Sequence, residues 1–173
     1  MALLDNLLDG GRAARDGAAL LLAVSDASRQ PGLFGDERLA DTLEGRLESL
    51  TLHASLALVR LQKEPGLKRR AAAFTDQLFR NIDAGLRESG VGDLSVPRRM
   101  RTIASQFYGR LGVYSVALEA DDQSALTEAL ARNTGARAFA PALAAYARQT
   151  AQAQAELGAD AVSTEAGWPP APG

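Results

Sequence analysis

The sequence GVGDLSVPRRM at residues 90–100 separates two strongly helical patterns and decides how they are joined. Gly90 and Gly92 permit backbone angles that other residues resist, so they suit a sharp break between helices. Pro97 favours the first turn of the next helix, because its fixed φ is already helical and its missing N–H needs no partner there. Ser95 is placed to cap the exposed backbone donors. The stretch therefore predicts one helix that ends at Gly90 and another that begins near Pro97.

Apolar residues on both sides of this turn recur every three or four positions, which is the spacing of an amphipathic helix. No stretch of strand length alternates apolar and polar residues. We expect helical segments near residues 3–8, 16–28, 36–63, 67–89, 97–118, 122–132 and 139–157. Asp121-Asp122 offers the expected cap of the sixth segment, and Asn133-Thr134-Gly135 is its stop signal. The expected fold class is all-α: a single compact multi-helix domain with short loops and a flexible C-terminal tail.

Two of these stripes organise the expected domain. One should form the central helix and runs through Leu39, Leu43, Leu47, Leu50, Ala54, Leu58 and Leu61. The other follows Pro97 and runs through Met100, Ile103, Ala104, Phe107, Leu111, Tyr114 and Leu118. Within the second stripe, Gly109 and Gly112 are small residues that would allow close helix packing. On a helical wheel Arg98 and Arg101 point away from it, while Arg99 and Arg110 flank it.

The domain organisation follows from length and composition. A chain of 173 residues fits one domain, so we expect a helical domain at residues 1–157. Residues 158–173 are rich in Gly, Pro, Ala and acidic side chains, which predicts a mostly disordered tail. Trp168 is the exception, because a lone aromatic residue in such a segment can dock back onto the body.

Charge is concentrated in the middle of the chain, where residues 60–110 hold 11 basic and 5 acidic side chains. Such a region indicates contact with an anionic partner, although a solvated basic surface is the equally open alternative. We expect Lys68, Arg69 and Arg70 to lie on the same side as the arginines after Pro97. Candidate partner-binding residues are Lys68, Arg69, Arg70, Asp93, Arg98, Arg99, Arg101, Tyr108 and Arg110.

Motifs for catalysis, metals and cofactors are missing. His53 is the only histidine and cysteine is absent, which leaves neither a thiolate metal site nor a His-Glu-x-x-His zinc motif. His53 lies near the edge of the central leucine stripe and is expected to be a packed structural residue. Asp76 and Asp83 share a helix face two turns apart. We therefore expect no enzyme and no cofactor; a small helical enzyme would need His53, Asp76 or Asp83 to converge on a polar pocket.

The sequence also bears on location. The first residues lack the basic region and cleavage pattern of a secretory signal. The longest purely apolar run, residues 18–24, is much shorter than the roughly 20 residues of a membrane span. We expect the protein in the cytoplasm, or bound peripherally at the inner face of the membrane, with no transmembrane segment.

The block around the turn resembles the ubiquinol–cytochrome c chaperone family, and the resemblance extends over roughly residues 19–133. It rests on Leu78-Phe79, Ile82-Asp83, Leu86-Arg87-Glu88, Gly90-Val91-Gly92-Asp93-Leu94, Val96-Pro97-Arg98-Arg99 and Phe107-Tyr108-Gly109-Arg110. Asp41-Thr42-Leu43-Glu44-Gly45-Arg46 and Leu52-His53 upstream, and Ala129-Leu130-Ala131-Arg132-Asn133 downstream, fit the same pattern. The absence of a transit peptide makes the chain look like a bacterial member.

The resemblance implies an assembly chaperone for the ubiquinol–cytochrome c reductase that binds newly made cytochrome b. It also implies work near the ribosomal tunnel exit with a small partner protein. The family supplies no catalytic residues, so the sites named above are interaction candidates only. The alternative from the residues themselves is a ribosome- or RNA-binding helical module that uses Arg98, Arg99 and Arg101.

Overall fold

The computed structural model describes the backbone of residues 2–172 and the side chains of residues 14–172. Six α-helices follow one another in this range: α1 (Ala2–Ala27), α2 (Leu43–Gln62), α3 (Lys68–Glu88), α4 (Val96–Glu119), α5 (Gln123–Thr134) and α6 (Ala140–Leu157). Short 3-10 helices occur at Pro31–Leu33, Pro65–Leu67, Ala159–Ser163 and Glu165–Gly167. Within the described residues, extended pairing is limited to one bridge between Phe34 and Leu39. The expected all-α class is therefore confirmed.

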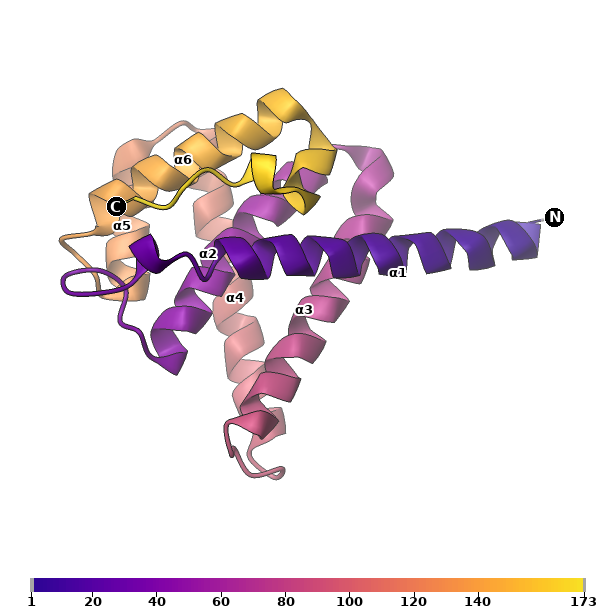
Figure 1. Cartoon of the computed structure of the whole chain (residues 1–173), viewed down its shortest axis with the longest axis horizontal. Helices are drawn as coiled ribbons and strands as arrows, with labels where there is room; N and C mark the ends of the chain where they lie inside the picture. The colour runs from indigo at the N-terminus through magenta and orange to yellow at the C-terminus, as the bar shows by residue number, and fades with distance from the viewer. Residues whose placement is uncertain (1, 173) are drawn as a thin grey trace.

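Helix α2 lies at the centre, and α1, α3, α4, α5 and α6 all pack against it (Figure 1). Every residue from Thr51 to Val59 is buried, as expected for a helix that other elements surround on all sides. The expected start near Asp36 was wrong, because residues 34–42 form a loop and Thr42 caps α2 by accepting a hydrogen bond from Gly45 N at 3.2 Å. Leu39 is nevertheless buried, so the apolar pattern predicted its burial correctly although the residue is not helical.

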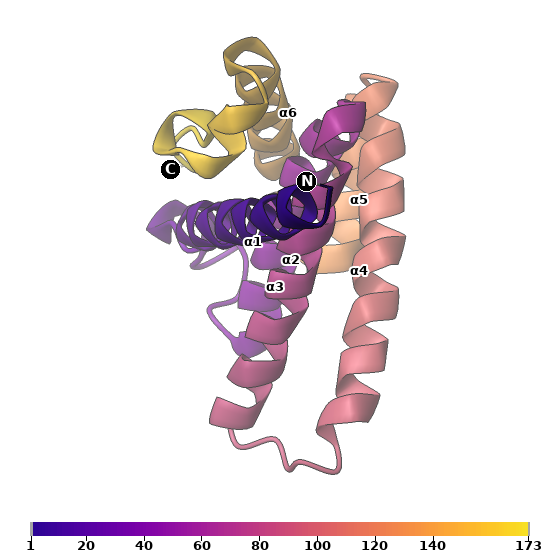
Figure 2. The same ribbon diagram turned by 90° about the vertical axis from the view of Figure 1, so that its right-hand side faces the viewer.

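Helices α3 and α4 form an antiparallel hairpin around the turn of residues 89–95 (Figure 2). Gly90 has a φ of +82°, a left-handed conformation that glycine adopts without strain, and Pro97 lies in the first turn of α4. The expected Ser95 cap was wrong. Ser95 is next to α4, but its backbone is already helical and its side chain makes no capping hydrogen bond. At α5 the expected cap and stop are confirmed: Asp122 is the residue of Asp121-Asp122 that caps the helix, and the helix ends at Thr134 before a left-handed Gly135.

Helix α1 is one continuous element, where the sequence predicted a short segment at residues 3–8 and a separate helix at 16–28. It packs most extensively on α3, and Gly17 lies at the crossing. A Cβ atom at Gly17 would be 3.0 Å from both the backbone carbon of Ala73 and the backbone nitrogen of Phe74. The interpretation of Gly109 and Gly112 as close-packing residues was wrong, because both are exposed and a Cβ at either would meet nothing within 4 Å.

We expect Gly17→Val to lower the free energy of unfolding by about 1–3 kcal/mol, because backbone atoms cannot move aside as flexible side-chain ends do. Urea denaturation measures this loss. Gly112→Ala is the matched control and should raise stability by about 0.5–1 kcal/mol, since alanine restricts the unfolded chain and the site has room. A wild-type transition for Gly17→Val would contradict the α1–α3 crossing.

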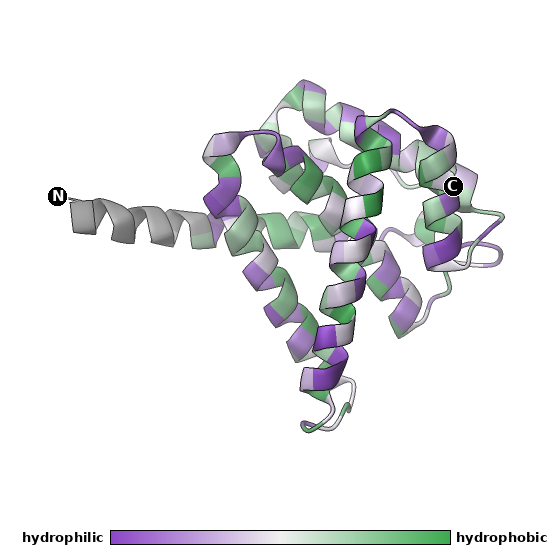
Figure 3. Cartoon of the chain, turned by 180° about the vertical axis from the view of Figure 1, so that it is seen from behind, coloured by the Kyte–Doolittle hydropathy of each residue, from purple (hydrophilic) through white to green (hydrophobic). Residues whose placement is uncertain are grey.

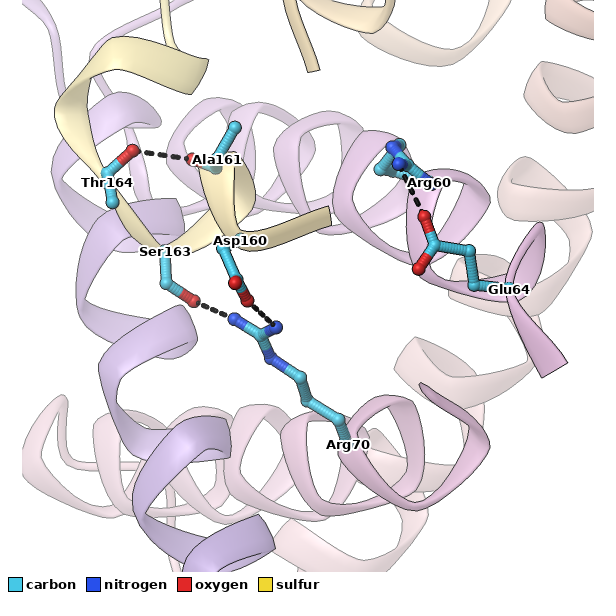
Figure 4. Close-up of polar contacts among 7 residues, drawn as sticks. All are labelled: Arg60, Glu64, Arg70, Asp160, Ala161, Ser163 and Thr164. Carbon is cyan, nitrogen blue, oxygen red and sulfur yellow. Dashed lines mark hydrogen bonds and ion pairs between the residues drawn. The ribbon is translucent and has the colours of Figure 1, made fainter. Parts of the chain in front are cut away.

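The C-terminal segment folds back over the body, contrary to the mostly disordered tail expected for residues 158–173. Its two short 3-10 helices lie beside α1 and α6, and Arg70 of α3 donates hydrogen bonds to Asp160 and Ser163, both at 2.7 Å (Figure 4). Trp168 is 6% exposed and donates from Nε1 to Val162 O at 3.1 Å. The expected docking of Trp168 is therefore confirmed.

Hydrophobic and hydrophilic residues are interspersed along α4 (Figure 3). Ile103, Phe107, Leu111 and Tyr114 are buried, while Arg98 and Arg101 are exposed, as the helical wheel predicted. Within the described residues, no helix is both long and apolar enough to cross a membrane.

Candidate functional site

An apolar groove lies between the N-terminal half of α2 and the α3–α4 hairpin. The sequence placed Leu43, Leu47 and Leu50 on the same stripe as the core residue Leu58. In the structure Leu43 is 45% exposed and the other two are half-buried, because no element covers this end of the stripe. The groove has a volume of about 610 Å³. The core stripe of α2 therefore continues into an open surface.

The opposite wall of the groove comes from the hairpin, and its end comes from the last turn of α1. Ile82 and Leu86 of α3 and Ile103 of α4 complete the apolar floor. Polar side chains surround this floor: Ser25, Ser28, Arg29, Glu44, Arg46, Glu48, Asn81, Arg99, Thr102, Gln106 and Arg110. An exposed apolar floor with a polar rim is typical of a surface that binds another chain.

A charged pair crosses one side of the groove. Arg110 Nη2 of α4 is 2.5 Å from Glu48 Oε1 of α2, and the two side chains are only 14% and 18% exposed. Burial raises the pKa of Glu48, and the attraction and hydrogen bond of Arg110 oppose this rise without reversing it. Glu48 Oε2 and Arg110 Nε are buried and have no hydrogen-bond partner among the described residues. The pair therefore links α2 to α4, but one polar atom of each side chain is left without a hydrogen bond.

The rim of the groove carries a small excess of positive charge, because three of its four arginines are balanced by acidic partners. Four arginines and two glutamates line it, and Arg110 and Glu48 neutralise each other. Arg99 makes an exposed pair with Glu44 at 3.3 Å, and Arg46 pairs with Asp41, which lies outside the lining, at 2.6 Å. Arg29 has no side-chain partner among the described residues. Exposed pairs of this kind contribute about 0–1 kcal/mol, so their arginines can exchange partners at little cost.

The predicted site residues do not form one patch. Lys68, Arg69 and Arg70 begin α3, whereas Arg98 begins α4, so the two groups lie at opposite ends of the hairpin, roughly 30 Å of helix apart (Figure 2). The expectation that they share a side was therefore wrong. Arg70 is engaged by the C-terminal segment, as described above.

Other candidates from the sequence have clear positions. Asp93 pairs with Arg87 at 2.7 Å in the turn of the hairpin, and Tyr108 is exposed beside Phe79 and Phe107. Arg99 and Arg110 line the groove. Arg98 and Arg101 are exposed and have no side-chain partner within the described part of the chain.

His53 is a core residue, as the sequence predicted. It is fully buried, with Nδ1 2.8 Å from Ser49 O, Nε2 2.9 Å from the Tyr146 hydroxyl, and its ring 5.6 Å from that of Trp168. Burial lowers the pKa of His53 to about 4 despite its hydrogen bond with Ser49 O. Asp76 is exposed and Asp83 pairs with Arg87 at 2.8 Å. The structure does not bring these three residues together, so the polar pocket that an enzyme would need around them does not form.

The buried His53 predicts a loss of stability in acid. Its pKa is lower in the folded state than the ordinary 6.5, so the unfolded state binds the proton first, and stability falls as the pH drops from 6.5 towards 4. The expected loss over this window is about 3 kcal/mol. Urea denaturation at a series of pH values measures it, with His53→Gln as the control, since glutamine does not titrate. Equal slopes for the two proteins would contradict a neutral buried His53.

A family model described as ubiquinol–cytochrome c chaperone matches residues 36–166, which is most of the chain. The chain belongs to the ubiquinol–cytochrome c chaperone family. A crystal structure of the Cbp3 homolog from Brucella abortus is similar to it, with 35% sequence identity, a TM-score of 0.79, and coverage of 95% of this chain and 93% of that one. Comparison with curated proteins found no match.

Family membership assigns the protein to the assembly chaperones of the ubiquinol–cytochrome c reductase, and it points to a non-enzymatic role. The matched residues include the groove walls from α2, α3 and α4, whereas Ser25, Ser28 and Arg29 precede the match. Sequence reasoning selected Arg99 and Arg110 of this chaperone but missed the groove between them and α2. The sequence showed the leucine stripe but gave no signal that its N-terminal end, from Leu43 to Leu50, is left uncovered.

Proposed function

We propose that this protein holds newly made cytochrome b during assembly of the reductase, and that the groove between α2 and the α3–α4 hairpin receives the client. Membership of the chaperone family supports the role. The single observation that carries the location is the open leucine stripe of α2, at Leu43, Leu47 and Leu50.

The groove has the properties that such a client requires. Cytochrome b is a membrane protein whose apolar helices must be kept from water before insertion. A helix can lay its apolar face into a groove with an apolar floor, and each buried side chain contributes about 1.5–3 kcal/mol. The surrounding polar side chains keep the empty groove compatible with water. No catalytic step is needed for this activity.

The test is complementation in cells that lack the protein. We expect deletion to lower both cytochrome b and reductase activity, and the wild-type gene to restore them. Leu43→Glu should fail to restore them, because it places a charge on the exposed part of the groove floor. Val116→Glu is the matched control, since Val116 is 68% exposed on α4 and does not line the groove. Unchanged cytochrome b after deletion would overturn the proposed function.

A second partner is suggested by the exposed arginines at the start of α4. We propose that Arg98, Arg99 and Arg101 contact the ribosome near the tunnel exit, because Arg98 and Arg101 have no partner within the described residues and their face is open. Phosphate groups are the anions that such arginines bind most readily. This contact would place the groove near the emerging client.

Changing Arg98, Arg99 and Arg101 together to Glu should leave the melting temperature nearly intact, because each exposed substitution costs no more than about 0.5 kcal/mol. The variant should nevertheless lose ribosome co-sedimentation, and wild-type binding should weaken steadily with added salt. Normal co-sedimentation with a normal melt would make the face a plain solvated surface. A collapsed melt would show that these arginines have a structural role.

A further inference from the structure

We infer that the groove selects one amphipathic helical segment whose flanking side chains are acidic. This inference rests on the proposed function, because it specifies which part of a client the same groove would hold. It follows from three features of the groove: its length, its apolar floor and the sign of the charge on its rim.

Length limits the occupant to a single short helix. The α4 wall runs from Arg99 to Arg110, and the α2 wall from Leu43 to Leu50. At 1.5 Å per residue, eleven steps along α4 span roughly 16 Å, which is about three turns of helix. The volume of about 610 Å³ is that of a site for one segment and not for a helical bundle.

The floor requires an apolar stripe on the occupant. Leu43, Leu47 and Leu50 are spaced by four and three residues, so they form one ridge along α2. Ile82 and Ile103 line the same groove from the α3–α4 hairpin. A helix seated between the two walls buries one apolar face and leaves its ends and its outer face near the rim.

The rim determines the charge of those ends. Arg29 lies at the α1 end of the groove without a side-chain partner among the described residues, and Arg99 lies on the α4 wall in a weak exposed pair. Acidic flanks would pair with both arginines. Lysine or arginine flanks, which are frequent in the cytoplasmic loops of membrane proteins, would be repelled. The rim therefore discriminates among apolar helices that the floor alone would accept equally.

The experiment measures binding of three labelled peptides to the full chain by fluorescence anisotropy. Each peptide is an amphipathic helix of about twelve residues, roughly three turns, with Leu along one face, Ala and Gln on the other, and Glu, Gln or Lys pairs at both ends. We expect the Glu peptide to bind about tenfold more tightly than the Lys peptide at low ionic strength, with the Gln peptide between them. Added salt should reduce this difference.

Charge reversal at the rim tests the assignment directly. Arg29→Glu with Arg99→Glu should abolish or invert the preference, and circular dichroism checks that the variant is folded. Arg80→Glu with Arg137→Glu is the matched control, because it changes the net charge equally at exposed positions that do not line the groove. The control should keep the wild-type preference.

The outcomes separate this inference from the proposed function. Equal binding of the three peptides, tighter binding of the Lys peptide, or no binding at all would each overturn the acidic-helix inference. Failure of the proposed function is scored independently, by cytochrome b levels in the deletion strain. A strain that loses cytochrome b while the three peptides bind equally would retain the chaperone role and refute only the charge selection.

Discussion

Replacing Trp168 by Ala is expected to lower the free energy of unfolding by about 3–5 kcal/mol, the range for removing a large aromatic side chain from a core. Trp168 is 6% exposed and packs against the ring of His53, which itself bonds with Tyr146 of α6. It is the largest apolar side chain that the C-terminal segment contributes to the core. Its loss removes the main reason for the segment to stay closed over α1 and α6.

Urea denaturation followed by circular dichroism measures this effect. Glu165→Gln is the control, because Glu165 belongs to the same segment and is exposed; it should unfold like the wild type. Trp168→Phe should give an intermediate loss, since it keeps an aromatic ring but removes the hydrogen bond from Nε1 to Val162 O. If Trp168→Ala unfolds at the same urea concentration as Glu165→Gln, the segment contributes no packing energy.

Replacing Arg110 by Leu should also cost about 3–5 kcal/mol, because it leaves the Glu48 carboxylate largely buried without a counter-charge. Burial already raises the pKa of Glu48 in the wild type, and removing Arg110 takes away the main opposing influence. The variant should therefore recover stability as the pH falls and Glu48 becomes protonated. Leucine keeps most of the side-chain volume, so the charge is the main change.

The double variant with Glu48→Leu and Arg110→Leu distinguishes the effect of the unpaired charge from the effect of lost packing. We expect it to be much more stable than Arg110→Leu alone, because no uncompensated charge remains between α2 and α4. Denaturation of the wild type, both single variants and the double variant at neutral and mildly acidic pH completes the cycle. A double variant as unstable as Arg110→Leu would show that packing, and not charge, dominates at this position.

Local patterns in the sequence determined the helices and much of the core. The stripe of Phe74, Leu78 and Ile82 is buried on α3, and the stripe after Pro97 is buried on α4, because a periodic apolar face has to leave water wherever it packs. Asp122 and Gly135 bound α5 for equally local reasons, through a side-chain cap and a left-handed residue. The family was also recognisable from the block at residues 78–110, because those residues are contiguous.

Tertiary structure alone decided which parts of those apolar faces are covered. Leu43 and Leu58 belong to the same stripe, yet one lines the groove and the other lies in the core, since only the second has helices on every side. The partners of Glu48 and of Trp168 are equally non-local. Periodicity specifies the face of a helix that avoids water, but which element covers it depends on contacts between residues far apart in the chain, and the open groove is the place where that coverage ends.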